Sequence, residues 1–379
     1  MVARGSFLRL RRGHFGILLA FLSLISCAGV QPRPPIRLEP QPSVHREPRP
    51  RPFIPPQAEV QPPSPPQPPA ELQPPSTPQP QVRIFPEFVA LITQPGDTFS
   101  SLAATYLKDP SLGWYISEFN ERQSLSPGQE LIIPLKFRQR GGLSFRGYQT
   151  VPVISYHKFS KTKVDRTTVQ ESAFEAQMQY LRQNGYRVLT MAEFFDFLDF
   201  HRVIPKKSVV ITIDDDWRSA YEIAFPILRR YGYPATLFVY TDSIRDKGPD
   251  WGLIGEMSQS GIDIQGHTKT HRNLDKRLSQ ESFREYFEAL KKELTESAEI
   301  IRKRLNKKVK YLAYPYGDTN PLIIAFLRKI GYRGAFTVKR GSNPSFIHHY
   351  QIYRAMIYGH FTLQDFERNL AYFTTQEID

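Results

Sequence analysis

The sequence reads Ser-Val-Val-Ile-Thr-Ile-Asp-Asp-Asp at residues 208–216, which is a run of β-branched residues followed by three aspartates. A continuous apolar run of this kind is typical of a strand buried on both faces in a parallel sheet. Aspartate is a poor strand former, and adjacent carboxylates repel one another and lose hydration when buried. Strand stability therefore does not account for Asp214, Asp215 and Asp216, whereas a bound cation does.

The chain around this stretch alternates short apolar segments with amphipathic ones, from about residue 148 to the C-terminus. The predicted strands are residues 151–156, 187–189, 208–213, 236–240, 262–265, 310–313 and 334–338. The predicted helices are residues 171–184, 192–198, 220–231, 280–305 and 321–330. This alternation indicates an α/β domain over residues 148–379, and about seven units favour an irregular (β/α) barrel over an open sheet. Its chemistry is expected at the carboxyl ends of the strands.

Two histidines follow a later short strand, in Gln265-Gly266-His267-Thr268-Lys269-Thr270-His271. Histidines four residues apart lie on one face of a helical turn and converge on one ion. Two imidazoles and one aspartate leave ligand positions for water and substrate, which is typical of a catalytic metal site. The alternative for an isolated pair is two surface or core histidines, but the aspartates at a matching strand end favour the metal.

A third segment, Leu312-Ala313-Tyr314-Pro315-Tyr316-Gly317, also lies at a predicted strand end. Pro315 and Gly317 shape a loop whose backbone N–H groups could face the site. The alternative is a turn with buried tyrosines.

Together these three segments resemble the signatures of the polysaccharide deacetylases, also called the NodB homology domain or carbohydrate esterase family 4. The resemblance implies that Asp214 is the general base. It also implies that Asp215, His267 and His271 hold zinc or another divalent transition metal, and that the Tyr316 N–H stabilises the oxyanion. The implied reaction is hydrolytic N-deacetylation of N-acetylglucosamine in peptidoglycan or an exopolysaccharide.

Three positions depart from the family pattern. Asp216 stands where the family has glycine, and Ala313 stands where it often has an arginine, for which Arg354 is the nearest candidate to orient Asp214. The family's general-acid histidine is not obvious: His360 and His157 are both candidates. These departures motivate one alternative, a catalytically inactive glycan-binding protein. Another alternative is a deacetylase of O-acetyl esters, because the same metal chemistry attacks esters more easily than amides.

A small module precedes the barrel at residues 87–135. An apolar strand, a turn at Gly96-Asp97-Thr98, two short helices and a closing strand after Leu125-Ser126-Pro127-Gly128 predict a βααβ unit. These residues resemble the LysM family, which implies binding of N-acetylglucosamine glycans. Candidate contacts are Gly96, Asp97, Thr98, Leu125 and Pro127, although turn residues such as Gly96 and Pro127 also serve the backbone alone.

The first 82 residues predict an export signal and a spacer. Arginines precede an apolar stretch too short for a membrane span, and Cys27, the single cysteine of the chain, follows Leu24-Ile25-Ser26. This resembles a bacterial lipoprotein signal over residues 1–27, with acylation of Cys27 as the membrane anchor. Residues 28–82 hold more than half of the 33 prolines and predict a disordered or extended tether. Ala28 favours the outer membrane, facing the periplasm.

The net charge of +13 does not indicate nucleic acid as a partner. Part of it lies in the leader, and part in runs such as Lys291-Lys292 and Arg302-Lys303-Arg304, which on a helix are usually a solvated face. The sequence lacks the aromatic and basic stripe that single-strand binders use. The oligomeric state is not predicted.

Overall fold

The computed structural model describes residues 82–136, 140–144, 146–215, 218–245 and 250–375. The predicted signal peptide, Cys27, most of the tether and Asp216 lie outside these residues. Within them, no helix is both long and apolar enough to cross a membrane.

Residues 82–136 form a small module with a three-stranded antiparallel sheet in the order β1-β2-β3. Its elements are β1 (Arg83–Ile84), β2 (Phe88–Ile92), α1 (Phe99–Leu107), α2 (Gly113–Phe119) and β3 (Glu130–Pro134). The two helices pack on the sheet through a buried apolar cluster that includes Val89, Leu102 and Ile116. The order strand, helix, helix, strand is the one that the hydrophobic pattern predicts.

The larger domain is built on a curled sheet whose main strands run parallel, in the order β13-β12-β11-β10-β9-β5. These strands are β5 (Gly147–Tyr156), β9 (Ser208–Asp214), β10 (Thr236–Val239), β11 (Asp263–Gly266), β12 (Tyr311–Ala313) and β13 (Gly334–Phe336). Shorter strands lie at the edges and in the connections: β4 (Leu143–Ser144), β6 (Lys158–Ser160), β7 (Thr168–Gln170), β8 (Arg187–Val188), β14 (Ser342–Pro344), β15 (Ala355–Met356) and β16 (Phe373–Thr375).

The curled sheet is not an evenly closed barrel. β15 pairs in parallel with β5, and an isolated parallel bridge between Phe336 and Ile352 links the far edge at β13 to the segment before β15. The predicted strand at residues 187–189 is only the two-residue β8, which pairs with the first part of β9. The predicted irregular barrel of about seven units is therefore corrected in part: the sheet is a curled, parallel half-barrel, and its edges are linked by irregular backbone.

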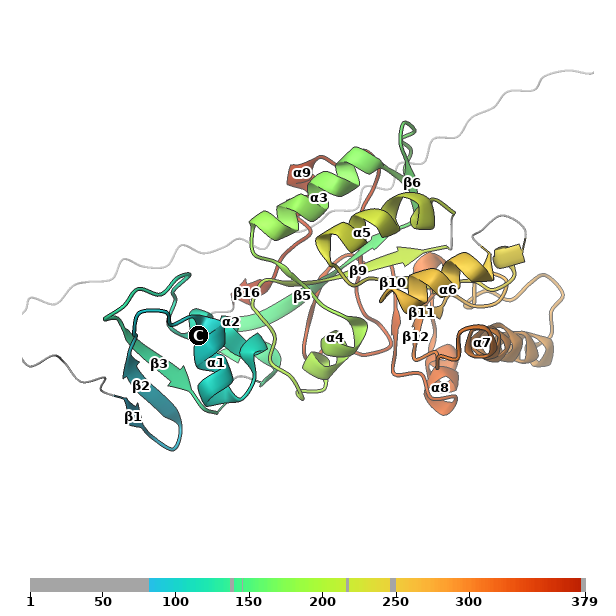
Figure 1. Cartoon of the computed structure of the whole chain (residues 1–379). Helices are drawn as coiled ribbons and strands as arrows, with labels where there is room; N and C mark the ends of the chain where they lie inside the picture. The colour runs from blue at the N-terminus through green and yellow to red at the C-terminus, as the bar shows by residue number, and fades with distance from the viewer. Residues whose placement is uncertain (1–81, 137–139, 145, 216–217, 246–249, 376–379) are drawn as a thin grey trace, which may run out of the picture. The chain divides into compact units, whose positions relative to one another are not determined.

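Helices cover the outside of this sheet (Figure 1). They are α3 (Glu171–Gln183), α5 (Phe225–Tyr231), α6 (Trp251–Gln259), α7 (Phe283–Leu305), α8 (Pro321–Lys329) and α9 (Leu363–Glu367). Helix α4 (Met191–Leu198) instead packs on the other face of the sheet, where Phe195 contacts Tyr311 and Phe336. α7 begins at Phe283 rather than at the predicted residue 280, because Ser282 forms a capping box with Glu285. The predicted helix at 220–231 is a π-helical turn over Ala220–Ala224 that continues into α5.

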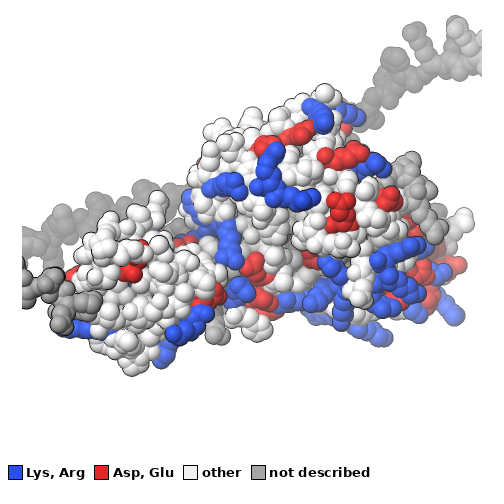
Figure 2. Space-filling model, viewed as in Figure 1, with Lys and Arg blue, Asp and Glu red and all other residues white. Residues whose placement is uncertain are grey.

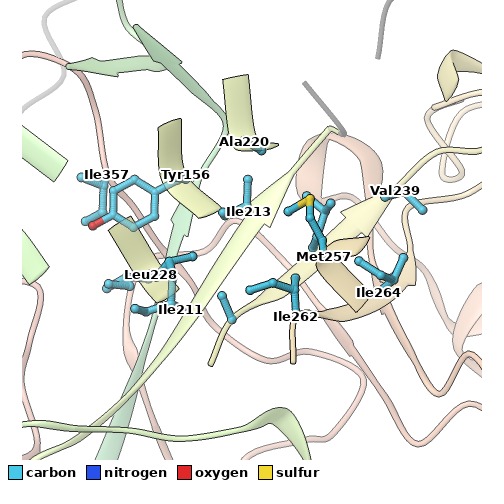
Figure 3. Packing of buried hydrophobic residues seen from close by; sticks show 14 of the residues in the cluster. Tyr156, Ile211, Ile213, Ala220, Leu228, Val239, Met257, Ile262, Ile264 and Ile357 are labelled. Atoms are coloured by element: carbon cyan, nitrogen blue, oxygen red, sulfur yellow. The ribbon is translucent and has the colours of Figure 1, made fainter. Parts of the chain in front are cut away.

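Side chains alternate between the two faces of the sheet, so the core consists of two apolar clusters, one on each face. Ile211 and Ile213 of β9 point toward the helices and pack with Tyr156, Leu228 and Ile264 (Figure 3). Val210 belongs to a separate cluster with Phe238 and Phe336. Because side chains alternate along a strand, Asp214 points to the same side as Val210, the inner side of the curled sheet.

Lysine and arginine residues on α7 alternate with acidic residues (Figure 2). Arg302 and Lys303 both pair with Glu299, and Lys291 pairs with Glu288. These i,i+3 and i,i+4 pairs match the solvated helix face that the sequence predicts.

Candidate active site

Parallel pairing brings the predicted site residues to one edge of the sheet. Tyr156 of β5 is in register with Ile213 of β9, so His157, just after β5, and Asp214, the last residue of β9, lie at the same level of two adjacent strands. Gly266 of β11 is in register with Leu312 of β12, so His267 and Ala313 are likewise neighbours. Residues that are far apart in the sequence therefore meet at the carboxyl ends of the strands, as a parallel sheet requires.

Asp215, His267 and His271 form the cluster that could hold a metal, with one ligand atom from each within 4.8 Å of the others. The Asp215 Oδ1 atom lies 3.4 Å from His267 Nε2 and 3.2 Å from His271 Nε2. Ligands about 2.0–2.2 Å from a tetrahedral zinc ion lie roughly 3.4 Å from one another. The donor set and its spacing therefore fit a divalent transition metal.

His267 is held in the orientation that a metal ligand needs. Its ring is buried, and Nδ1 lies 2.8 Å from the Ala313 carbonyl oxygen. A carbonyl only accepts hydrogen bonds, so Nδ1 carries a proton, and Nε2 is the ring nitrogen that faces Asp215 and would bind an ion. Burial opposes protonation of His267, but its hydrogen bond with Asp215 and the charge of Asp214 raise its pKa overall.

His271 reaches the cluster from a loop. Residues 267–271 form no helical turn, so the expected helical geometry of the histidine pair is wrong. The loop instead bends back through left-handed backbone at Thr268 (φ 72°) and His271 (φ 65°). The Thr268 hydroxyl accepts a hydrogen bond from the His271 N–H at 3.1 Å.

Asp214 is the buried carboxylate next to this cluster, with 2% of its surface exposed. The Arg354 Nη1 atom donates to Asp214 Oδ1 at 2.6 Å, and Arg354 Nε donates to the Thr337 carbonyl oxygen at 2.9 Å. Burial would raise the pKa of Asp214, but the charges of Arg354, His267 and His157 lower it below its ordinary value. Arg354, itself fully buried, thus contacts Asp214 as the sequence suggested, although residue 313 is alanine.

The pKa of Asp215 is likewise set by burial and by polar contacts that act in opposite directions. Burial raises its pKa, but the hydrogen bonds from His267 and His271 lower that pKa well below the ordinary value of a carboxyl group. The carboxyl group of Asp215 is therefore ionised at physiological pH, as a metal ligand must be.

Tyr316 borders the cluster on another side. Its ring centroid lies 5.0 Å from that of His271, and its backbone φ of 62° is left-handed. The side chain is 62% exposed, so the tyrosine ring is open to a ligand while it stays in contact with His271.

The structure separates the two general-acid candidates. His157 is partly buried and interacts electrostatically with Asp214 and Asp215. Burial lowers the pKa of His157, and these two carboxylates oppose that shift. His360 is exposed and stacks on Tyr358. Among the described residues, its contacts do not include the cluster of Asp215 and the two histidines. Of the two, the structure brings only His157 to the site.

The five candidate glycan contacts of the module lie in its loops. Thr98 caps α1 by accepting from the Ser101 N–H, and Asp97 accepts from the Gln94 N–H at 2.6 Å. Gly96 has φ 91° with open space around it, Leu125 packs against the module core and Pro127 is exposed. Thr98 and Asp97 therefore have backbone roles, whether or not they touch a ligand.

One residue close to the site was not predicted. Glu293 of α7 is buried and accepts hydrogen bonds from the loop between His267 and His271. Its sequence position held a usable signal, because it falls on the same helical stripe as the buried residues Tyr286, Leu290 and Leu294. A carboxylate on an apolar stripe indicates a buried partner.

Residues 201–335 match the family model described as polysaccharide deacetylase. The domain belongs to that family. It is a carbohydrate esterase family 4 domain, and its reaction class is hydrolytic removal of acetyl groups from a polysaccharide.

Individual relatives agree with this assignment. YxkH of Bacillus subtilis, provisionally named a polysaccharide deacetylase, is 30% identical over 193 residues, which cover 51% of this chain and 66% of YxkH. The poly-beta-1,6-N-acetyl-D-glucosamine N-deacetylase of Staphylococcus aureus is 26% identical over 59% of this chain and 81% of its own length. The solved structure of IcaB from Ammonifex degensii matches with a TM-score of 0.52 and 26% identity, over 59% of this chain and 97% of that structure.

Proposed function

We propose that this polysaccharide deacetylase removes N-acetyl groups from N-acetylglucosamine units of an envelope polysaccharide, with a divalent metal as cofactor. The observation that carries the proposal is the position of Asp214. A buried, ionised carboxylate is held by Arg354 directly beside a cluster of two imidazoles and a carboxylate. This arrangement pairs a general base with a metal site.

Asp215, His267 and His271 are the residues that would hold the ion. When bound, a divalent ion acts as a Lewis acid that lowers the pKa of water and polarises a carbonyl group. Zinc is the metal we expect, because two imidazoles and one carboxylate match its catalytic sites.

The chain's own residues would carry the proton transfers. Asp214 takes the proton of the attacking water, and its lowered pKa keeps it ionised for that task. The Tyr316 N–H donates to the oxyanion that forms on the acetamide. His157 gives a proton to the departing amine, and its lowered pKa makes the protonated ring a stronger acid. The products are acetate and a glucosamine unit.

One argument for a catalytically inactive, glycan-binding protein no longer holds. The hypothesis rested partly on Ala313, which leaves Asp214 without the usual arginine, and Arg354 supplies that contact from the segment just before β15. The O-acetyl ester hypothesis has no observation of its own in its favour, and remains an outcome of the experiment below.

The rest of the chain suits an immobile substrate. We propose that residues 87–135 are a LysM module that binds the same glycan, which raises the effective concentration of the catalytic domain on the polymer. We also propose that acylated Cys27 anchors the protein to a bacterial membrane, with the outer membrane's periplasmic face as its place.

Acetate release tests this function. Residues 83–379 would be incubated with peptidoglycan, with N-acetylglucosamine oligomers of β-1,6 and β-1,4 linkage, and with an O-acetylated glycan, each with added zinc or with chelator. We expect release from an N-acetylated polymer that chelator abolishes and that Asp214→Asn reduces by about 10²- to 10⁴-fold. Retention of glycan and zinc without acetate release would support the binding protein instead.

A further inference from the structure

The loop between the two histidine ligands adopts a backbone conformation that is unfavourable on its own. Thr268 and His271 both have positive φ, at 72° and 65°. For a β-branched residue such as threonine, left-handed backbone is a genuine outlier. Such conformations persist only where the surrounding structure holds them in place.

One side of this loop is held by the connection after β10. The Thr241 N–H donates to the Thr268 carbonyl oxygen at 3.3 Å, and the Asp242 N–H donates to the Lys269 carbonyl oxygen at 2.9 Å. These two bonds satisfy loop carbonyls. They leave the amides of Lys269 and Thr270 to find acceptors on the other side.

Those amides both donate to a single carboxylate. Oε2 of Glu293 accepts from the Lys269 N–H and from the Thr270 N–H, each at 2.9 Å. Oε1 of Glu293 accepts from the Thr270 hydroxyl at 2.7 Å. Glu293 therefore binds three donors that all lie between the two histidine ligands.

Helix α7 presents this carboxylate from a buried position, with 6% of Glu293 exposed. Burying a carboxylate is unfavourable unless hydrogen bonds replace its hydration, and charge-assisted bonds of this kind are stronger than neutral ones. The acidic side chain therefore stabilises α7 only while the loop is in its bent conformation. The helix and the loop conformation thus depend on each other.

We propose that Glu293 is the positioning residue of the metal site. By binding the amides of Lys269 and Thr270 it holds the His267–His271 loop in the conformation in which both imidazoles face Asp215. This inference rests on the proposed metal-dependent function. Because Glu293 orders the loop before the ion arrives, binding of the ion does not have to order it.

Variants of Glu293 and Thr270 distinguish the hydrogen bonds that the Glu293 carboxylate accepts from its negative charge. Glu293→Ala removes all three acceptor contacts. Glu293→Gln keeps an oxygen for the two amides and turns its NH₂ group toward the Thr270 hydroxyl, which can rotate to accept. Thr270→Val removes only the hydroxyl contact. Glu288→Ala is the matched control, because Glu288 lies on the exposed part of the same helix and pairs only weakly with Lys291, at 3.9 Å.

Two measurements on the full-length protein test the proposal without relying on activity. The first is the dissociation constant for Zn²⁺, from competition with a fluorescent chelator. The second is hydrogen exchange of the Lys269 and Thr270 amides in the metal-free protein. We expect Glu293→Ala to weaken zinc binding by about 10- to 100-fold and to speed exchange of both amides. Glu293→Gln should recover most of the affinity, Thr270→Val should lose less than Glu293→Ala, and Glu288→Ala should match the wild type.

Acetate release gives a third readout that a purely structural role would not reproduce. In Glu293→Ala, saturating zinc should restore kcat, while KM for the glycan stays unchanged. Wild-type zinc affinity and wild-type exchange in Glu293→Ala would overturn the proposal. If Glu293→Ala does not fold, Thr270→Val decides the matter by the same two measurements, because wild-type zinc affinity and wild-type exchange in that variant would overturn the proposal. If the wild type itself binds no zinc, the proposed function fails, and the exchange measurement still shows whether Glu293 orders the loop.

Discussion

Arg354 and Asp214 are separated by 140 positions in the sequence, yet they form a buried ion pair beside the cluster of Asp215 and the two histidines. Removing one partner of such a pair leaves an uncompensated charge. Arg354 therefore keeps Asp214 ionised and also fixes the orientation of its carboxylate.

Arg354→Met should move the acid limb of the kcat/KM profile to higher pH. The pKa of Asp214 is now below its ordinary value, so the base stays ionised as the pH falls. Without the arginine charge, burial raises that pKa, and activity is lost at a pH about one to three units higher. The measurement is the pH dependence of acetate release, with Arg354→Lys as the control that keeps the charge. An unchanged acid limb in Arg354→Met would show that Arg354 does not tune Asp214.

The two candidate general acids can be compared directly. His157→Asn should lower kcat by about 10²- to 10⁴-fold, because His157 follows β5 at the level of Asp214. His360→Asn should leave kcat unchanged, because that exposed ring stacks on Tyr358. Steady-state kinetics on one N-acetylated oligomer, together with zinc affinity as a control, checks both. The opposite ranking would return the role to His360.

At the scale of elements, loops and caps place the functional groups more than the regular strands do. The Tyr316 loop is an example. Gly317 has φ 80°, and a Cβ atom there would lie 2.4 Å from Val338 Cγ2 and 2.6 Å from the Val338 backbone nitrogen. The left-handed φ of residue 317 and the close approach of Val338 therefore both require a glycine at this position.

Gly317→Ala should disrupt this loop and lower kcat, because the Val338 backbone cannot move away as a flexible side chain could. Gly232→Ala is the matched control, since Gly232 also has positive φ (68°) but open space around it. It should cost only the left-handed strain, about 1–2 kcal/mol. Thermal unfolding and acetate release on both variants measure the difference. Equal losses in the two would mean that the contact with Val338 has no effect.

In the small module, Asn120 joins α2 to β3. Its Nδ2 donates to the carbonyl oxygens of Ile116 and Ile132 at 2.8 and 2.7 Å, and its Oδ1 accepts from the Ile132 N–H at 2.9 Å. Asn120→Asp replaces the donor with an oxygen facing two carbonyls. We expect the module to lose about 2–3 kcal/mol of its free energy of unfolding, measured by denaturant titration. Asn120→Ala should also destabilise it, whereas unchanged stability in both variants would contradict the structural role.

At the scale of the whole molecule, the metal should link folding to cofactor supply. Zinc that binds only the folded state stabilises it by about 2.7 kcal/mol at a hundred times its dissociation constant. Chelator should therefore lower the melting temperature of the wild type, and excess zinc should restore it. The double variant His267→Ala/His271→Ala should show no response to either reagent. A zinc response that survives in that variant would place the ion elsewhere.

The hydrophobic pattern alone predicts much of this architecture. The alternation of apolar and amphipathic segments predicts a parallel sheet. The aspartates, the histidine pair and the Pro315–Gly317 loop each follow or end a predicted strand, so they place the chemistry at the strand ends. The βααβ order of the module follows in the same way from short-range turns and apolar spacing.

Contacts between distant segments could not be obtained in this way. Arg354 was a candidate partner of Asp214 only because the family resemblance calls for an arginine there. The adjacency of His157 to Asp214 and the support of the histidine loop by Glu293 depend on strand register and helix docking. The left-handed bend at Thr268 and His271 also replaced the expected helical turn, because bonds from outside the loop outweigh its local preference. Local sequence specifies which elements form and where reactive groups gather. Tertiary packing decides which of those groups contact one another. These contacts form only when the strands align and the helices bury their apolar faces against them.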